Sequence, residues 1–129
     1  MPESGSQIST GISIVHPGHV GNECFMTKGH VHAQLDFAEV YYIISGEGYM
    51  LMEKTDNKAV SKKISANDVL YVPGNCAHRT VNTGTSDLVM LFALRADAGH
   101  DYQIVANKGF SDSVFWTPDG TCLVNCNQA

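Results

Sequence analysis

Short apolar segments alternate with turn residues along almost the whole chain. Glycine, proline, Asn and Asp punctuate the sequence about every eight to twelve residues, and the segments between them are rich in Val, Ile, Tyr, Phe and Thr. This pattern is typical of an all-β sandwich or barrel. It predicts strands over residues 11–15, 23–27, 38–44, 48–53, 59–64, 69–72, 78–82, 88–94, 102–105, 114–116 and 121–124.

Helix and domain boundaries are both hard to find in this pattern. No segment of about ten residues or more has the spacing of an amphipathic helix, so we expect little helix. The 129 residues are the size of one domain, and the chain shows no repeat, linker or low-complexity tract. We therefore expect a single domain over residues 1–129, with its barrel core at about residues 11–126.

The segment 38–44 carries a carboxylate on the face that we expect to be buried. Side chains alternate between the two faces of a strand, so Glu39, Tyr41 and Ile43 share one face. A carboxylate buried among apolar groups costs free energy unless a positive group pairs with it. No Lys or Arg alternates onto this face. A divalent cation would meet that need.

Three histidines are candidates to share the cation with Glu39. His30 and His32 stand two residues apart, so in a strand both imidazoles point to one side. His78 follows a proline turn at the head of the segment 78–82. Three imidazoles and a carboxylate suit Fe, Zn, Ni or Mn better than Ca or Mg. We predict one divalent transition metal per subunit, although a single His-x-His pair often arises by chance.

Charge and cysteine content narrow the classes of partner. The formal net charge is −5 and no run of Lys or Arg exceeds two residues, which argues against nucleic acid. No apolar stretch approaches the roughly 20 residues that span a bilayer. The first residues lack the features of a signal peptide, so we expect a cytoplasmic protein that does not bind membranes.

The chain has four cysteines: Cys24, Cys76, Cys122 and Cys126. We expect all four to be reduced thiols. The alternative for Cys122 and Cys126 is that they form half of a zinc site.

Two motifs resemble those of the cupin superfamily. His30-x-His32 with Glu39 and Gly46 resembles the first cupin motif, and the segment 73–78 with Asn82 resembles the second. The resemblance implies a single-domain cupin fold, which is a double-stranded β-helix or jelly-roll barrel.

Two positions depart from the usual cupin pattern in a way that preserves the turns. Cupins usually carry glycine where this chain has Asn67 and Asn75. Asn is the non-glycine residue that best tolerates a left-handed backbone. We therefore expect both turns to keep their geometry.

Longer segments are similar to the cupin-type phosphoglucose isomerase family, with the resemblance covering roughly residues 11–126. The most specific is Thr27-Lys28-Gly29-His30-x-His32 followed by Ala38-Glu39-x-Tyr41. The others are Pro17-Gly18 with Val20-Gly21, Tyr71-Val72-Pro73, the segment 77–84, Ala96-Asp97-Ala98-Gly99-His100-Asp101-Tyr102, and Lys108-Gly109-Phe110.

This resemblance implies an activity and a set of site residues. The implied reaction interconverts glucose 6-phosphate and fructose 6-phosphate in a homodimer. The implied metal ligands are His30, His32, Glu39 and His78. Glu39 is the implied proton shuttle, with a metal-assisted hydride shift as the alternative, and Tyr41 and His100 are expected beside the reacting sugar. The implied substrate-binding residues are Ser13, Thr27, Lys28, Gly29, Tyr41 and Tyr102.

Alternatives to this assignment come from the residues themselves. Tyr41 could simply fill the core, His100 could cap a loop, and Arg79 could be a structural ion-pair partner. The family usually has an aromatic residue where this chain has Leu94, and an additional amino-terminal segment of several tens of residues. Either departure would be compatible with an isomerase or epimerase for another sugar phosphate, or with a sugar-phosphate-binding cupin that does not turn over. An oxygenase is a further cupin alternative.

Overall fold

The chain forms β-strands joined by short turns in a computed structural model. The structure describes residues 6–29, 37–54, 58–98, 112–118 and 120–125, and contains no helix within these ranges. The strands are β1 (Ile8–Val15), β2 (His19–Val20), β3 (Glu23–Cys24), β4 (Glu39–Ser45), β5 (Glu47–Lys54), β6 (Ala59–Ser65), β7 (Val69–Val72), β8 (Cys76–Asn82), β9 (Leu88–Arg95), β10 (Asp112–Thr117) and β11 (Gly120–Asn125).

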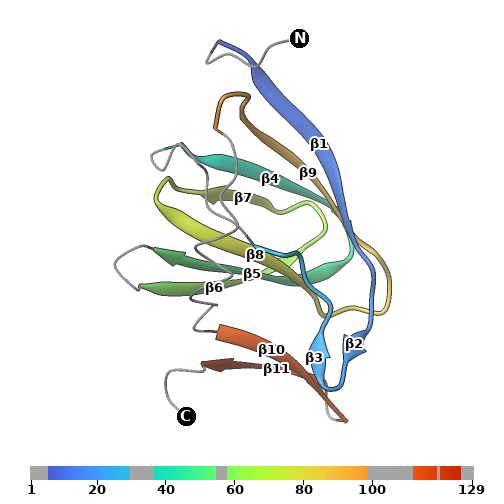
Figure 1. Cartoon of the computed structure of the whole chain (residues 1–129). Helices are drawn as coiled ribbons and strands as arrows, with labels where there is room; N and C mark the ends of the chain where they lie inside the picture. Colours follow the sequence, from blue (N-terminus) through green and yellow to red (C-terminus); the bar gives the residue numbers. More distant parts are fainter. Residues whose placement is uncertain (1–5, 30–36, 55–57, 99–111, 119, 126–129) are drawn as a thin grey trace.

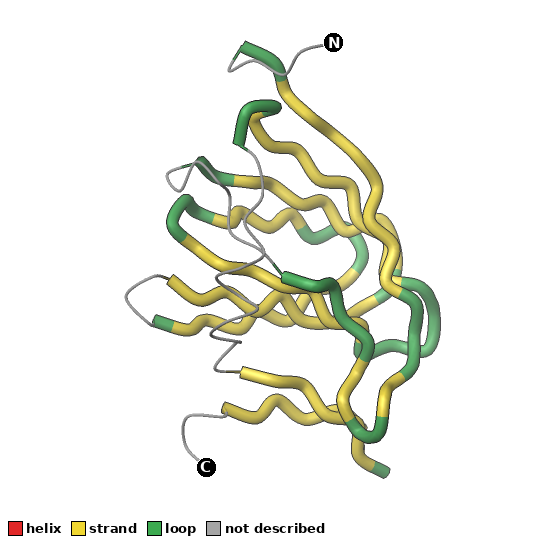
Figure 2. Tube along the Cα trace, viewed as in Figure 1, coloured by secondary structure: helices red, strands yellow, loops and turns green. Residues whose placement is uncertain are grey.

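These strands form three antiparallel sheets (Figures 1 and 2). The first has the order β1-β9-β4-β7, the second β6-β5-β8, and the third β11-β10-β3-β2. The second and third sheets are linked through the segment that follows β3. There Met26 bridges to Val81, and Thr27 donates its N–H to the Thr80 carbonyl at 2.9 Å. The second sheet forms the layer that faces the first sheet across the main core.

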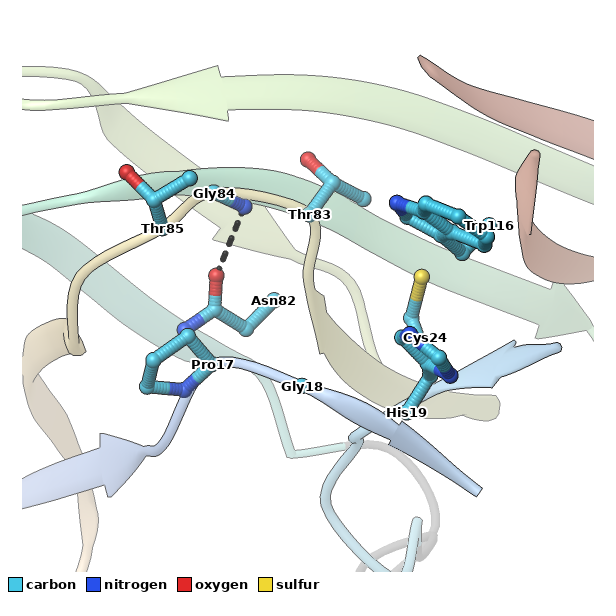
Figure 3. A pocket seen from close by; sticks show the side chains of 9 residues that line it. All are labelled: Pro17, Gly18, His19, Cys24, Asn82, Thr83, Gly84, Thr85 and Trp116. Atoms are coloured by element: carbon cyan, nitrogen blue, oxygen red, sulfur yellow. Dashed lines mark hydrogen bonds between the residues drawn. The ribbon is translucent and has the colours of Figure 1, made fainter. Parts of the chain in front are cut away.

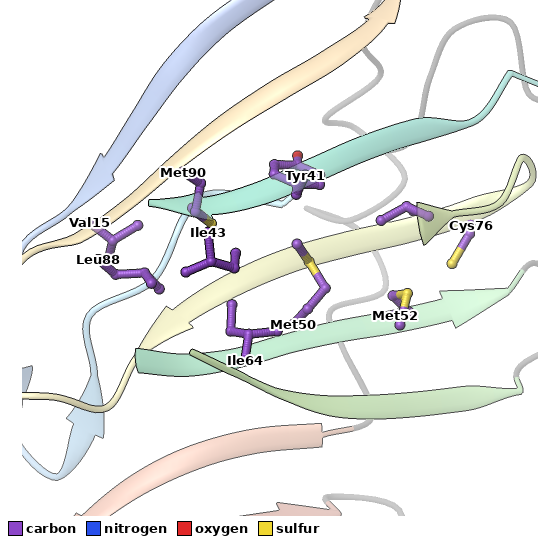
Figure 4. Packing of buried hydrophobic residues seen from close by; sticks show 10 residues of the cluster. Val15, Tyr41, Ile43, Met50, Met52, Ile64, Cys76, Leu88 and Met90 are labelled. Carbon is purple, nitrogen blue, oxygen red and sulfur yellow. The ribbon is translucent and has the colours of Figure 1, made fainter. Parts of the chain in front are cut away.

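The main core lies between these two layers (Figure 4). Ile43 and Met90 from the first sheet are fully buried, as is Met50 from β5. The alternation predicted for the segment 38–44 is confirmed, because β4 buries Glu39, Tyr41 and Ile43 and exposes the residues between them. Burying an apolar side chain such as Ile43, Met50 or Met90 stabilises the fold by about 1.5–3 kcal/mol.

A smaller apolar cluster covers the other face of β5 and β8. It joins Leu51 and Val81 to Cys24 of β3 and Val114 of β10. These contacts tie the third sheet to the barrel. Both β5 and β8 are therefore packed on two sides, which fixes the position of every residue that β8 presents to the interior.

The turns follow the sequence-based expectation. Asn67 and Asn75 have φ angles of 73° and 56°, so both adopt the left-handed conformation that cupins usually give to glycine. Cys24 and Cys76 are free thiols, as expected. The side chains of Cys122 and Cys126 lie outside the described part of the structure, so the expectation for them stays a prediction.

The predicted strands agree with the structure except at a few positions. The prediction missed β2, and the expected strand 23–27 is reduced to β3 plus the isolated bridge at Met26. The strand expected at 102–105 lies outside the described residues. In the described part of the chain, no helix has the length and apolar character that crossing a membrane requires.

Candidate active site

A buried carboxylate and a buried imidazole meet between the two layers. Glu39 begins β4 in the first sheet, and His78 lies in β8 on the facing layer. Their exposed fractions are 3% and 2%, and Glu39 Oε2 lies 3.0 Å from His78 Nε2. Thirty-nine residues separate them in sequence, so the fold brings them together.

The contact of the second ring nitrogen of His78, Nδ1, shows which tautomer this histidine adopts. Nδ1 lies 3.2 Å from the Cys76 carbonyl oxygen, which can only accept a hydrogen bond, so Nδ1 carries the hydrogen. In the neutral ring Nε2 then presents a lone pair to the Glu39 carboxylate. Two acceptors at 3.0 Å repel each other unless a proton or a cation lies between them.

This arrangement fits a metal site. Histidines that bind metals usually donate their other ring N–H to a carbonyl or carboxylate, which fixes the tautomer and directs the lone pair at the metal. The Cys76 carbonyl does this for His78. An imidazole and a carboxylate are also the donor types that transition metals prefer.

Tyr41 lies next to this pair on the same face of β4. It is 6% exposed, and its ring meets the His78 ring edge to face, with centroids 6.0 Å apart at 73°. It packs in the main core, so its predicted site role and the alternative of a core filler are both compatible with its position. The cross-strand neighbours in β9 are Leu94 opposite Glu39 and Phe92 opposite Tyr41.

The segment that leads toward His30 is held against β8. Thr27 donates its backbone N–H to the Thr80 carbonyl, and the Thr27 hydroxyl oxygen accepts the Thr80 N–H at 3.0 Å. Arg79 donates to the Lys28 carbonyl at 2.8 Å. Gly29 is buried and has a φ of 81°, a conformation that favours glycine. Thr27 therefore lies beside Thr80, which is two residues beyond His78 in β8. Gly29 is the last described residue before His30.

Arg79 makes a hydrogen bond to the backbone of the neighbouring segment, and the ion-pair role considered in the sequence analysis stays a prediction. Burial lowers the pKa of its guanidinium group, and the nearby Glu23 carboxylate opposes that effect. Its bond to the Lys28 carbonyl holds the segment of Thr27 in place.

Ser13 lies away from the Glu39–His78 pair. It is opposite Met90, and Met90 is opposite Ile43, four residues along β4 from Glu39. At about 3.3 Å per residue this places the two rows about 13 Å apart along the strands. Of the predicted substrate-binding residues that the structure describes, Ser13 is thus the one separated from the pair.

Four predicted site residues lie outside the described residues: His30, His32, His100 and Tyr102. Their roles remain predictions. Within the described residues, no group of three or more His, Cys, Asp or Glu side chains could hold a metal. The described part of the predicted ligand set is therefore the pair Glu39 and His78.

Sequence reasoning missed one buried polar neighbour and one backbone contact. Thr80 lies two residues beyond His78 on the same face of β8, is 2% exposed, and donates to Met50 Sδ at 3.7 Å. The two-residue period that paired His30 with His32 also identifies Thr80. The hydrogen bond from His78 to the Cys76 carbonyl leaves no signal in the sequence, because it depends on where the backbone carbonyl points and not on the type of side chain.

Solved structures with the same fold include oxalate decarboxylase from Bacillus subtilis. One structure of this enzyme, determined at pH 4.6, gives a TM-score of 0.60 with 30% identity over 73% of this chain and 22% of that chain. A study of its Mn(II) centres describes another, with a TM-score of 0.59, 31% identity, and coverage of 70% and 22%. The sheet order, the two-layer core and these neighbours define the molecule as a cupin.

Sequence comparison identifies the family within that class. The family model described as "Glucose-6-phosphate isomerase (GPI)" matches residues 3–128, so the chain belongs to this family. Glucose-6-phosphate isomerase of Thermococcus litoralis is 43% identical over 112 residues, or 87% of this chain and 59% of the relative. The Pyrococcus furiosus enzyme is 44% identical over the same shares. A putative glucose-6-phosphate isomerase 2 of Rhizobium meliloti is 41% identical over 82% of this chain and 53% of the relative.

Proposed function

We propose that this chain is a metal-dependent aldose–ketose isomerase that interconverts glucose 6-phosphate and fructose 6-phosphate. The chain spans 59% of the length of its Thermococcus and Pyrococcus relatives, whose names give that activity. The observation that carries the proposal is the buried contact of 3.0 Å between Glu39 and His78. It puts a potential base beside a potential metal ligand in the interior of a cupin barrel.

Glu39 acts as the proton shuttle in this proposal. Its carboxylate takes the proton from C2 of the open-chain aldose phosphate, and the electrons of that C–H bond form the C1–C2 double bond of an enediol. The C1 carbonyl electrons move to O1, which takes up the proton that the O2 hydroxyl loses. The same carboxyl group returns its proton to C1, so that C2 becomes the ketone. General base catalysis of this kind contributes about 10²–10⁴-fold. Burial of Glu39 also keeps water away from the transferred proton.

His30, His32, Glu39 and His78 would hold one divalent Fe, Zn, Ni or Mn ion. When bound, this ion would stabilise negative charge on the sugar oxygens by several kcal/mol. Support for His78 comes from its Nδ1–H contact with the Cys76 carbonyl, which turns Nε2 toward Glu39. The Mn(II) centres reported for oxalate decarboxylase show that this fold accommodates such an ion in a relative.

The sugar phosphate would lie between the Glu39–His78 pair and the segment 27–29. Thr27 is suited to hold phosphate, because its oxygen accepts the Thr80 N–H and its own hydroxyl hydrogen can donate elsewhere. Gly29 allows close approach of backbone N–H groups, and Lys28 supplies positive charge. Tyr41, His100 and Tyr102 are proposed to orient the sugar hydroxyls, and Ser13 stays a prediction with weaker geometric support.

Metal analysis of the purified chain tests the ligand assignment. We expect about one equivalent of metal in the wild type, and a large loss in His78→Ala because a metal site rarely survives removal of one nitrogen ligand. His16→Ala is the matched control, since His16 is an exposed histidine paired with Asp87 outside this site. Equal metal content in wild type and His78→Ala would refute the assignment.

A coupled assay with fructose 6-phosphate on protein loaded with Fe, Ni, Mn or Zn tests the activity. We expect turnover with at least one of these metals. Metal and sugar-phosphate binding without turnover in all four cases would favour a binding protein instead. Leu94 opposite Glu39 gives a specific reason to include other aldose phosphates, because the pocket then lacks the usual aromatic side chain beside the base.

We also propose that the protein forms a homodimer through the outer face of the first sheet. Register places Leu91, Tyr42 and Val69 in one row across β9, β4 and β7. Nine large apolar side chains are exposed on this face: Ile8, Ile12, Ile14, Val40, Tyr42, Ile44, Val69, Tyr71 and Leu91. An apolar patch that extends over four strands is typical of a protein–protein interface.

A further inference from the structure

A cavity of about 340 Å³ lies at the far end of β8 from His78. Figure 3 shows its two sides. His19, Cys24 and Trp116 lie on one, and Pro17 with the loop after β8 lies on the other. Asn82 lines this cavity, four residues along β8 from His78, which corresponds to about 13 Å along the strand. The cavity is thus separate from the Glu39–His78 pair, and its volume is within the range of small-molecule sites.

One wall is a flat aromatic platform. The rings of His19 and Trp116 stack with centroids 5.0 Å apart and planes inclined by 12°. Trp116 is held by its backbone N–H, which donates to the Asn22 carbonyl, and His19 by its Nδ1–H, which donates to the Gly21 carbonyl. Because the two rings cover each other on one face, at most one face of Trp116 is left for a ligand.

The opposite wall is polar and rigid. Asn82 is 1% exposed and donates to the carbonyls of Val15 and Ser86, both at 2.8 Å, while its Oδ1 accepts the Gly84 N–H. These bonds fix the loop whose residues Thr83 and Thr85 line the cavity. Each hydroxyl can donate one hydrogen bond and accept others.

Charge selects among the possible ligands. The described residues that line the cavity include no Asp, Glu, Lys or Arg. Glu23 is close enough to Cys24 to raise the thiol pKa, adding to the larger effect of burial. The Glu47 side chain lies near Gly84, with Glu47 Cγ 3.1 Å from where a Cβ would be. The lining therefore offers no cationic side chain to hold an anion such as a sugar phosphate.

We propose that this cavity is a second ligand site that binds a neutral pyranose sugar without a phosphate group. A pyranose ring has an apolar C–H face, which suits the aromatic platform, and hydroxyl groups at its edge, which suit Thr83 and Thr85. A flat aromatic ligand would gain from a slot between two parallel rings, but here the second ring is already stacked on the first. The proposal is independent of whether Glu39 is catalytic.

The single tryptophan of the chain makes the test direct, since Trp116 is part of the site. Titration of the full chain with D-glucose, followed by tryptophan emission, is expected to give a saturable change with a dissociation constant of about 1 mM or weaker. The same titration of Glu39→Gln should be unchanged. This control shows that the signal does not come from the other site.

Two paired variants separate the role of the hydroxyl groups from a loss of structure. Thr83→Val/Thr85→Val should weaken glucose binding about tenfold or more, because two hydrogen bonds are lost. Thr83→Ser/Thr85→Ser keeps both hydroxyls and should bind nearly as the wild type does. Circular dichroism of each variant confirms that the fold is retained.

Three results would overturn the proposal. The first is no emission change with glucose, galactose or mannose. The second is tighter binding of glucose 6-phosphate or adenine at this site than of the neutral sugars. The third is equal affinity of the valine and wild-type proteins.

Discussion

At the residue scale, the alternation along β4 was predictable and the partner of Glu39 was not. Burial of Glu39 and Tyr41 follows from the two-residue period of a strand. The contact with His78 does not follow from any local pattern, because it joins strands in different layers. His78 was one of three candidate histidines, and the resemblance to cupins supported that choice. The Cys76 carbonyl that orients His78 could not be predicted, since no side-chain type marks it.

Cys24 gives a test at the same scale. Burial, with a smaller contribution from Glu23, raises the pKa of its thiol above the ordinary value of 9.0. The folded state then keeps this proton to a higher pH than the unfolded chain does. The stabilisation is complete below the unfolded-state pKa and is lost as pH rises through the folded-state pKa.

Wild-type stability should therefore fall more steeply between about pH 8 and pH 10 than that of Cys24→Ala. Urea unfolding at a series of pH values measures both slopes. Identical slopes for the two proteins would show that the thiol is not perturbed by folding.

At the element scale, the strands were predicted well where they are long and poorly where they are short. All four strands of the first sheet were found, because each is a segment rich in apolar residues between clear turns. β2 was missed because it has only two residues, between Gly18 and Gly21. β3 ends earlier than predicted, since the chain beyond it pairs with β8 only at Met26.

The turn between β4 and β5 offers a stability test. Gly46 has a φ of 87°, and a Cβ there would lie 2.5 Å from the Asp87 carbonyl oxygen. Gly46→Ala should destabilise the fold by more than the roughly 1–3 kcal/mol that a strained backbone alone costs. Gly21→Ala is the matched control, because its φ is also positive at 57° but no atom lies within 4 Å of the added Cβ. Equal losses in chemical denaturation would contradict the account of this turn.

At the scale of the whole molecule, the cupin fold was predicted, but the outer apolar face of the first sheet was not. The sequence predicts that every second residue of β4 points to the outer face of its sheet. It does not show that the neighbouring strands extend this outer face into one apolar surface. Register provides this information, since Leu91 and Tyr42 lie side by side. The homodimer was expected from the resemblance and from the strand edges that an open β sandwich leaves to cover, and the apolar face is the surface that we propose for it.

Analytical ultracentrifugation tests this interface. The wild type should be a dimer, and Leu91→Lys should weaken dimerisation at least tenfold because a charge would be buried without a partner. Val60→Lys is the control, since Val60 is 46% exposed on β6, outside this face. A wild-type monomer, or a Leu91→Lys dimer as stable as the wild type, would exclude the proposed interface.

The central claim is that Glu39, held against His78 inside the barrel, moves the proton in sugar-phosphate isomerisation. The most direct measurement is the initial rate with fructose 6-phosphate for Glu39→Gln and wild type, at matched metal content. We predict a rate about 10²–10⁴-fold lower in the variant, because an amide cannot accept the proton. A variant that keeps more than about one tenth of the wild-type rate would contradict the claim.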